Sequence, residues 1–243
     1  MADVTLETPD GPMPCFEARP AGATGAVIVI QEAFGVNDYI EDVANQLGSA
    51  GYHALAPHIF HRATEFRAGT RTAPYGDFAK VIPLFEGLTD DGIVADVDAC
   101  RRRLHDRGWS DGQIGIVGFC FGGRATFLAA IERPFGAAVG FYGGGIVTPR
   151  FPQFPALVDR TGELQAPWLG LFGDQDESIP VDDVERLRSE LAGAPVDAEI
   201  VRYPDAGHGF HCDRRDAFHE PSAADAWTRA LVWLDQHLEK REP

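Results

Sequence analysis

The chain has 243 residues, of which 44% are hydrophobic and 24% charged, a composition typical of an ordinary globular protein. Its formal net charge at pH 7 is −16, from 37 acidic against 21 basic residues. Because such a field repels polyanions and anionic membrane surfaces, we expect neither nucleic-acid binding nor membrane binding. An anionic small molecule is not excluded, since a local basic pocket can hold one.

The N-terminal sequence and the cysteines indicate a cytoplasmic protein. Residues 1–7 lack the charged and apolar regions of a secretion signal, and no apolar run approaches the roughly 20 residues of a membrane span. Cys15, Cys100, Cys120 and Cys212 are scattered without a CxxC pair, so we expect reduced thiols. A chain of this length buries enough surface to fold without a metal or a disulfide.

Short apolar runs recur along the chain and predict buried strands. Each is too short for a helix and lacks the polar alternation of a half-exposed strand. Strands that are buried on both faces are typical of a mostly parallel sheet. The runs lie at 26–30, 114–118, 137–142 and 168–172, and a less apolar one lies at 198–202.

Amphipathic segments between these runs predict helices. Asp38, with Glu41 three residues later, resembles a capping box that opens a helix through Leu47. Three further segments place apolar side chains on one helix face. These stripes are Ile93-Val97-Cys100-Leu104, Val184-Leu187-Leu191 after Pro180, and Trp227-Leu231-Leu234-Leu238.

The alternation of strands and helical crossovers predicts an α/β fold, a doubly wound, mostly parallel sheet with helices on both faces. Neither an internal repeat nor a low-complexity linker divides the chain, so we expect residues 1–243 to form a single domain. The stretch His58–Asp77 is polar and without pattern, which predicts a long loop arching over the sheet. Loops of this length in compact domains are more often functional than idle.

A tight turn follows the predicted strand at 114–118 and presents Cys120 at its tip. The sequence Gly118–Gly123 (GFCFGG) then runs into a helical segment. This is the G-x-nucleophile-x-G elbow of α/β hydrolases, with cysteine in the serine position. The helix dipole favours a thiolate there, and the N–H of Phe121 is free to face a developing oxyanion. The alternative is a packed core cysteine, but strand, turn and helix all lie where the motif needs them.

A nucleophilic thiol needs a base, and the base needs an acid that orients it. In α/β hydrolases both follow the nucleophile along the chain, first the acid and then the histidine. Asp176 and His208 each come after a predicted strand, so both would reach the same carboxyl edge of the sheet as Cys120. Asp174 is the alternative orienting acid, in which case Asp176 would cap the following helix.

The remaining histidines raise the question of a metal site. His211, Cys212 and His219 lie near His208, but the group lacks a second cluster at ligand spacing, so we expect no zinc. The histidines upstream, which we interpret as solvated or hydrogen-bonded loop residues, are His53, His58 and His61.

Glu32 comes directly after the predicted strand at 26–30. A glutamate at the end of a buried strand is rarely fully buried without a partner. It is either a residue at the solvent rim, a cap on the next helix, or a side chain that reaches into the site, with the N–H of Ala33 as a second oxyanion donor. The spacing alone leaves these alternatives open.

Taken together, these residues resemble the dienelactone hydrolase family, the carboxymethylenebutenolidases. The elbow around Cys120 and the segment Gln31–Asn37 (QEAFGVN) are the most specific parts of the match. Shorter matches continue it in order along nearly the whole chain. They are Gly51-Tyr52 with Ala56-Pro57, Phe141-Tyr142-Gly143, Gly173-Asp174-Gln175-Asp176 with Pro180, and Ala206-Gly207-His208-Gly209-Phe210.

The resemblance implies an α/β-hydrolase fold and a catalytic triad of Cys120, Asp176 and His208, which places the orienting acid on Asp176. It also implies that Glu32 holds the resting cysteine as a thiol and receives its proton when substrate binds. A free thiol with a pKa of about 8.5 is mostly protonated at neutral pH and needs such activation.

The resemblance further implies the reaction. Cys120 would attack a lactone carbonyl and open the ring to an acyl thioester, which water activated by His208 would hydrolyse. The N–H groups of Ala33 and Phe121 would hold the oxyanion. Further substrate contacts are expected at Phe34, Phe85 and Tyr142.

The sequence departs from the family pattern where substrate binds. Members that act on dienelactone hold its carboxylate with two arginines, one of them shortly after the catalytic histidine, but here Cys212 stands four residues after His208. Losing a charge-assisted bond costs about 1.5–3 kcal/mol, or roughly ten- to a hundred-fold in selectivity. The arginines nearby, none of which matches residue for residue, are Arg67, Arg71, Arg214 and Arg215.

We therefore predict a monomeric enzyme without a cofactor that acts on a small lactone or ester. The alternative is a broader carboxylesterase, a thioesterase or an acyl transferase that uses the same three residues. The acceptor of the acyl group depends on the walls of the pocket, and these cannot be read from the sequence.

Overall fold

The structure is a computed structural model that describes residues 2–240. The prediction of one domain over residues 1–243 extends to Met1 and residues 241–243, which lie outside the described residues. The strands are β1 (Ala2–Thr8), β2 (Gly11–Ala18), β3 (Gly25–Ile30), β4 (Tyr52–Pro57), β5 (Ile114–Phe119), β6 (Ala137–Phe141), β7 (Trp168–Gly173) and β8 (Ala198–Tyr203).

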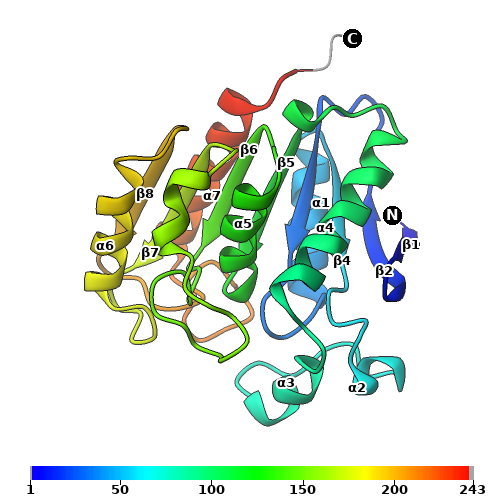
Figure 1. Ribbon diagram of the computed structural model, residues 1–243, viewed down its shortest axis with the longest axis horizontal. Helices are drawn as coiled ribbons and strands as arrows, with labels where there is room; N and C mark the ends of the chain where they lie inside the picture. Colours follow the sequence, from blue (N-terminus) through cyan, green and yellow to red (C-terminus); the bar gives the residue numbers. More distant parts are fainter. Residues whose placement is uncertain (1, 241–243) are drawn as a thin grey trace.

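These strands form one sheet in the order β1-β2-β4-β3-β5-β6-β7-β8 (Figure 1). All neighbours from β4 to β8 pair in parallel, and the pairs β1–β2 and β2–β4 are antiparallel. Every residue of the five central strands, β3 to β7, is buried. Burial on both faces explains why their sequences lack polar alternation. The predicted mostly parallel sheet is confirmed.

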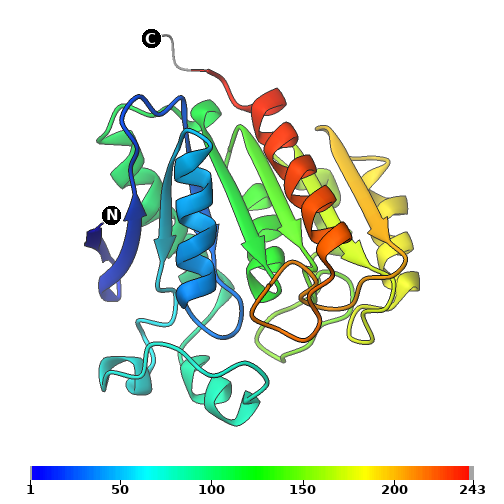
Figure 2. The ribbon, with the colours of Figure 1, turned by 180° about the vertical axis from the view of Figure 1, so that it is seen from behind.

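Helices cover both faces of the sheet, as the doubly wound prediction requires. α1 (Asp38–Ser49) and α7 (Glu220–His237) lie on one face (Figure 2), and α4 (Asp90–His105), α5 (Phe121–Glu132) and α6 (Val181–Leu191) on the other (Figure 1). Within residues 2–240, no helix is long and apolar enough to cross a membrane. The short elements are α2 (Thr64–Arg67), α3 (Phe78–Leu84), η1 (Asp111–Gln113) and η2 (Val158–Glu163).

The predicted helix faces agree with the structure in α4 and α6, whose apolar stripes are buried. In α7, Trp227 and Leu231 are only half-buried. Leu234 and Leu238 of the predicted stripe are buried, but Ala226 and Ala230 are buried in place of Trp227 and Leu231, because small side chains let the helix approach closely. The stripe predicted from large apolar residues alone was therefore rotated from the real one.

The start of α1 also differs from the predicted capping box. The N-cap is Asn37, whose side-chain oxygen accepts a hydrogen bond from the N–H of Ile40 at 3.2 Å. Asp38 is the first helical residue. An asparagine that caps the helix from outside satisfies a free N–H of the first turn equally well.

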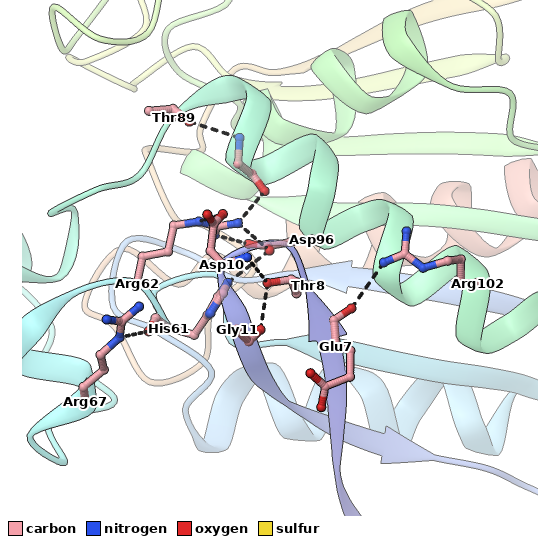
Figure 3. A network of polar contacts seen from close by, with 11 residues as sticks. Glu7, Thr8, Asp10, Gly11, His61, Arg62, Arg67, Thr89, Asp96 and Arg102 are labelled. Carbon is pink, nitrogen blue, oxygen red and sulfur yellow. Dashed lines mark hydrogen bonds and ion pairs between the residues drawn. The ribbon is translucent and has the colours of Figure 1, made fainter.

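The stretch His58–Asp77 is less irregular than predicted, since it includes α2 and begins with buried residues. A polar network ties its start to the rest of the fold (Figure 3). The guanidinium of Arg62 donates to both oxygens of Asp96 on α4, at 2.6 and 2.8 Å, and to Asp10 in the β1–β2 turn. His61 also contacts Asp96, at 3.1 Å. From this anchor the chain carries α2 and α3 beyond the carboxyl ends of the parallel strands (Figure 1).

Candidate active site

The site lies where the chain changes direction across the sheet. After β3 the chain crosses through α1 to β4 on one side, and after β4 it returns through α4 to β5 on the other side. The connections that leave the neighbouring carboxyl ends of β3 and β5 therefore lie on opposite sides of the sheet. Open α/β sheets bind their ligands at such a point. Glu32 follows β3 and Cys120 follows β5, so both lie at this point.

The turn between β5 and α5 has the geometry that the elbow motif predicts. Cys120 has φ 55° and ψ −115°, a left-handed conformation that a residue with a side chain adopts only when its surroundings impose it. A Cβ on Gly118 would lie 2.2 Å from the carbonyl oxygen of Gly122, and one on Gly122 would lie 2.3 Å from that of Ile30. The glycines therefore permit the close approach of strand and helix that exposes the thiol.

A chain of hydrogen bonds runs from Cys120 through His208 to Asp176. Nε2 of His208 lies 3.0 Å from Sγ of Cys120, and Nδ1 lies 2.6 Å from Oδ2 of Asp176. The other carboxylate oxygen of Asp176 accepts the N–H groups of Ser178 and Ile179, at 2.9 and 3.2 Å, and the hydroxyl of Ser178. Both oxygens of Asp176 are thus engaged, which fixes the carboxylate and, through it, the imidazole.

Asp174, the alternative acid, lies elsewhere. Both of its oxygens accept bonds from Arg202, at 2.7 and 2.8 Å. The geometry does not match an orienting role for Asp174. The α6 helix has Pro180 at its N-cap rather than Asp176.

The electrostatics favour a thiolate–imidazolium pair. Burial by itself lowers the pKa of His208, but Cys120 and Asp176 outweigh burial and raise that pKa to about 10. Burial raises the pKa of the Cys120 thiol, yet His208 outweighs this effect and lowers it below its ordinary value. Each partner stabilises the charged form of the other, as opposite charges at hydrogen-bond distance do.

Glu32 is completely buried, so it is neither a rim residue nor a helix cap. Its Oε1 forms an ion pair with Arg215 at 3.3 Å, and its Oε2 has no hydrogen-bond partner within residues 2–240. Burial raises the pKa of Glu32, although Arg215 and His208 act in the opposite direction. The thiol of Cys120 is bonded to His208 in this structure, and no hydrogen bond between described residues joins it to Glu32.

Arg215, named in the sequence analysis only as a nearby arginine, is a site residue whose pairing with Glu32 was not predicted. Its guanidinium lies over the rings of Phe34 and Tyr75, 5.6 and 6.0 Å from their centroids, while it pairs with Glu32. The sequence offered one signal for this ion pair: Arg215 lies in the loop after His208, and a glutamate after a buried strand needs a partner if it is buried.

The other arginines considered for substrate binding lie outside the site. Arg67 donates to the carbonyl of His61, and Arg71 lies over the ring of Phe66. Arg214 pairs with the surface carboxylates Asp42 and Asp213.

Three of the expected substrate contacts line a cavity of about 220 Å³ that includes Cys120. These are Ala33, Phe85 and Phe121. Phe34 and Tyr142 are not among its lining residues. Phe34 packs on Tyr75, with ring centroids 5.0 Å apart. Tyr142 is fully buried with φ 39°, and its ring lies 5.2 Å from that of His208, so both support the site from behind.

The side chains considered as zinc ligands turn to different partners. His211 bonds to the hydroxyl of Tyr39 at 2.8 Å, and Cys212 donates to that of Tyr75 at 3.5 Å. His219 contacts Ser222. Across the described residues, no three His, Cys, Asp or Glu side chains gather in a way that could hold a metal ion.

The three upstream histidines are buried rather than solvated, and of the two alternatives hydrogen bonding applies to His53 and His61. His53 is part of β4 and contacts Glu17 at 2.9 Å, and His61 contacts Asp96 (Figure 3). His58 packs against the ring of Phe66, and burial lowers its pKa to about 4.

Comparisons with known proteins agree with this architecture. The model of the "Dienelactone hydrolase family" matches residues 13–238. The "Putative carboxymethylenebutenolidase" of Salmonella typhimurium strain LT2 is 39% identical, with 99% of this chain and 94% of that protein covered. Its namesake from Escherichia coli K12 is 40% identical over 94% of this chain and 84% of that protein.

A solved structure extends the match to three dimensions. The crystal structure of a "Putative Dienelactone Hydrolase" from Klebsiella pneumoniae has a TM-score of 0.87 and 36% identity, with 97% of this chain and 98% of that chain covered. With its fold and its sequence shared over nearly the whole length, this chain belongs to the dienelactone hydrolase family.

Proposed function

We propose that this carboxylic ester hydrolase cleaves a lactone or a linear ester of a small molecule, with Cys120 as its nucleophile. The observation that carries the proposal is the hydrogen-bonded series from Cys120 through His208 to Asp176, set at the N-terminus of α5. The thiolate is the reactive form of cysteine, and both His208 and the helix dipole favour it.

In the first half of the reaction, Sγ of Cys120 attacks the carbonyl carbon. The carbonyl oxygen becomes an oxyanion, which the N–H groups of Ala33 and Phe121 are available to bind. Neither group donates in the backbone hydrogen bonds found outside helices and strands in the described chain. The carbon–oxygen bond of the ester then breaks, and the imidazolium of His208 gives its proton to the departing alkoxide. The product is an acyl thioester.

In the second half, neutral His208 takes a proton from water as the water oxygen attacks the thioester carbonyl. The carbon–sulfur bond breaks, the acid leaves, and Cys120 and His208 return to the ion pair. Asp176 keeps the imidazole in one orientation in both halves. For a lactone, the alcohol and the acid belong to one opened molecule.

Glu32 has a separate role in this proposal: where Cys120 is still a thiol beside an already protonated His208, Glu32 receives the thiol proton as the substrate binds. A buried carboxylate with a raised pKa and an unpaired Oε2 is suited to accept a proton. The negative charge of Glu32 raises the pKa of Cys120. Transfer of the proton from the thiol to Glu32 therefore creates the thiolate and removes the charge that opposes it.

Replacement of the nucleophile tests the mechanism. We expect Cys120→Ala to lower kcat by about 10⁴-fold or more on dienelactones, simple lactones and p-nitrophenyl esters, as removal of a triad nucleophile does. Iodoacetamide should label Cys120 in the wild type, while Cys15, Cys100 and Cys212 are buried and serve as internal controls. Full turnover by Cys120→Ala would show that the thiol is not the nucleophile.

The role of Glu32 is tested by Glu32→Gln, which keeps the shape of the side chain but cannot accept the proton. We expect kcat/KM to fall about 10²- to 10⁴-fold, the range of a lost general acid or base, while circular dichroism stays unchanged. Glu17→Gln is the matched control, because Glu17 is a buried carboxylate that contacts His53 and Arg103 instead. Equal kcat/KM in Glu32→Gln and wild type would contradict the role.

A further inference from the structure

The cavity beside Cys120 is walled by aromatic rings. Five phenylalanines line it, and the ring centroid of Phe85 lies 5.0 Å from that of Phe121 and 5.1 Å from that of Phe151. Phe121 and Phe154 are also 5.0 Å apart. Rings in such edge-on and tilted contacts hold one another in place. We call this cavity the aryl pocket; Phe78 and Val81 of α3 complete its outer wall.

Two arginines line the aryl pocket, but their charged groups are bound elsewhere. Arg124 donates to both oxygens of Asp90, at 2.6 and 2.9 Å, and to the carbonyl of Pro155. Arg150 donates to the carbonyl of Ser178. Arginine stems are apolar and can cover apolar surface while the guanidinium is held outside. Apart from these two arginines and Cys120, every lining side chain is a hydrocarbon or a glycine.

An exposed aromatic side chain stands at the mouth of the aryl pocket. Phe78 is 58% exposed, although it lines the cavity and lies 5.9 Å from the ring of Phe34. A large apolar residue in this position gains stability when a ligand covers it. Ile82, one turn later on α3, is 67% exposed and does not line the cavity.

We propose that the aryl pocket holds a ring-sized apolar group of the substrate. The substrates of this enzyme are then esters or lactones that bear a phenyl group or a cyclic hydrocarbon of similar size. This inference rests on the proposed function, because it assigns the group attached to the ester that Cys120 attacks.

The size of the cavity fits this class. A dry apolar cavity of about 150 Å³ holds one benzene molecule. The 220 Å³ of the aryl pocket therefore has room for a ring and the few atoms that join it to the ester. Complete burial of a phenyl-sized group is expected to raise kcat/KM about 10- to 100-fold above that of an ester that carries a methyl group in its place.

The test compares one ester without a ring with two esters that each carry a single phenyl ring. Methyl acetate, methyl phenylacetate and benzyl acetate are hydrolysed in a pH-stat, and each kcat/KM is divided by the rate constant for alkaline hydrolysis of the same ester. We expect one of the two ring-bearing esters to exceed methyl acetate by at least about tenfold. Methyl phenylacetate places the ring on the acyl side and benzyl acetate on the alcohol side, so the result also gives the orientation.

Two variants of the same helix separate pocket contacts from general effects. Phe78→Ala should raise KM for the preferred ring-bearing ester about three- to tenfold, and by a larger factor than it changes KM for methyl acetate, because it removes the wall that the ring covers. Ile82→Ala removes a similarly exposed side chain that lies outside the cavity, and it should leave KM unchanged for both substrates.

The outcomes separate this inference from the mechanism. Equal corrected kcat/KM for all three esters, abolished in each case by Cys120→Ala, would overturn the aryl pocket while the thiol mechanism stands. Turnover that survives Cys120→Ala would instead remove the mechanism on which the inference rests. Equal effects of Phe78→Ala and Ile82→Ala on KM would also contradict the assignment of the pocket.

Discussion

The proposed reactivity of Cys120 depends on two features of this residue. Its backbone is held in a left-handed conformation that glycine neighbours make possible, and its sulfur faces an imidazole that Asp176 orients. The first feature places the thiol at the N-terminus of α5. In the proposed mechanism, the second sets the pH range in which the thiol is a nucleophile.

The pH dependence of alkylation follows from the two pKa shifts. Because the pKa of Cys120 is lowered and that of His208 is raised to about 10, the thiolate–imidazolium pair forms below the ordinary thiol pKa of about 8.5 and persists until His208 loses its proton. We expect the rate of alkylation by iodoacetamide to reach half its plateau at a pH below the ordinary thiol pKa of about 8.5. The rate is measured by mass spectrometry from pH 5 to 11.

His208→Gln is the control for this profile, since it removes the cation that lowers the thiol pKa. The midpoint of alkylation should move up by at least about one pH unit. Identical profiles for wild type and His208→Gln would mean that the imidazole does not stabilise the thiolate. Cys212 offers an internal comparison, because burial raises its pKa to about 11.

Sequence patterns pointed to the hydrogen-bonded side chains but not to their surroundings. Cys120 was found from its elbow, and His208 from its place in the chain order. The pairing of Arg215 with Glu32 was not predicted. The two residues are 183 positions apart in the sequence, and no local spacing encodes their contact. Ser178 was missed for a different reason: its bonds to Asp176 depend on how a loop turns after β7.

At the scale of elements, the network around Asp96 connects α4, the β1–β2 turn and the segment that carries α2 and α3 (Figure 3). Asp96 is fully buried and receives two bonds from Arg62 and a contact from His61. Replacing this buried carboxylate leaves the buried guanidinium of Arg62 with only the half-exposed Asp10 as an ion-pair partner.

We therefore expect Asp96→Asn to lower the free energy of unfolding by about 3–5 kcal/mol, the usual cost of breaking a buried ion pair from one side. Urea unfolding followed by tryptophan fluorescence measures the change. Asp10→Asn is the control within the network, because Asp10 is half-exposed and its bond to Arg62 should contribute less than about 1 kcal/mol. Equal losses in both variants would show that burial of Asp96 is unimportant.

The elements themselves were predictable to different degrees. The central parallel strands were found because burial on both faces leaves runs of apolar residues in the sequence. The prediction did not include β1, β2 and β4: the first two contain polar residues at the edge of the sheet, and β4 (YHALAP) has no β-branched residue. The position of α3 over the site depends on contacts distant in sequence, such as that between Phe34 and Phe78.

At the scale of the whole molecule, parallel topology assembles the site from four separate segments. Glu32 follows β3, Cys120 follows β5, Asp176 follows β7 and His208 follows β8. These strands all point the same way, so their carboxyl ends meet at one edge. This convergence was predictable once the strands were recognised. The aryl pocket was not, because its walls come from α3, α5 and the segment after β6.

The net charge of −16 gives the whole molecule a further property that is independent of the site. Its field repels anions in solution, and salt screens that repulsion over about 10 Å at 0.1 M ionic strength. For an anionic ester such as a hemisuccinate, we expect kcat/KM to rise about two- to fivefold between 10 and 300 mM NaCl. The neutral methyl ester of the same compound should change by less than about 1.5-fold.

A fall in kcat/KM for the anionic ester with added salt would be equally informative. Arg150 lines the cavity and pairs with no carboxylate in the part of the chain that the structure describes, while Arg215 interacts electrostatically with Cys120, which also lines the cavity. If kcat/KM for the anionic ester falls as salt is added, these local cations attract the substrate more strongly than the distant carboxylates repel it. Arg150→Gln then tests the source, because it should reverse the salt dependence for the anionic ester and leave that of the neutral ester unchanged.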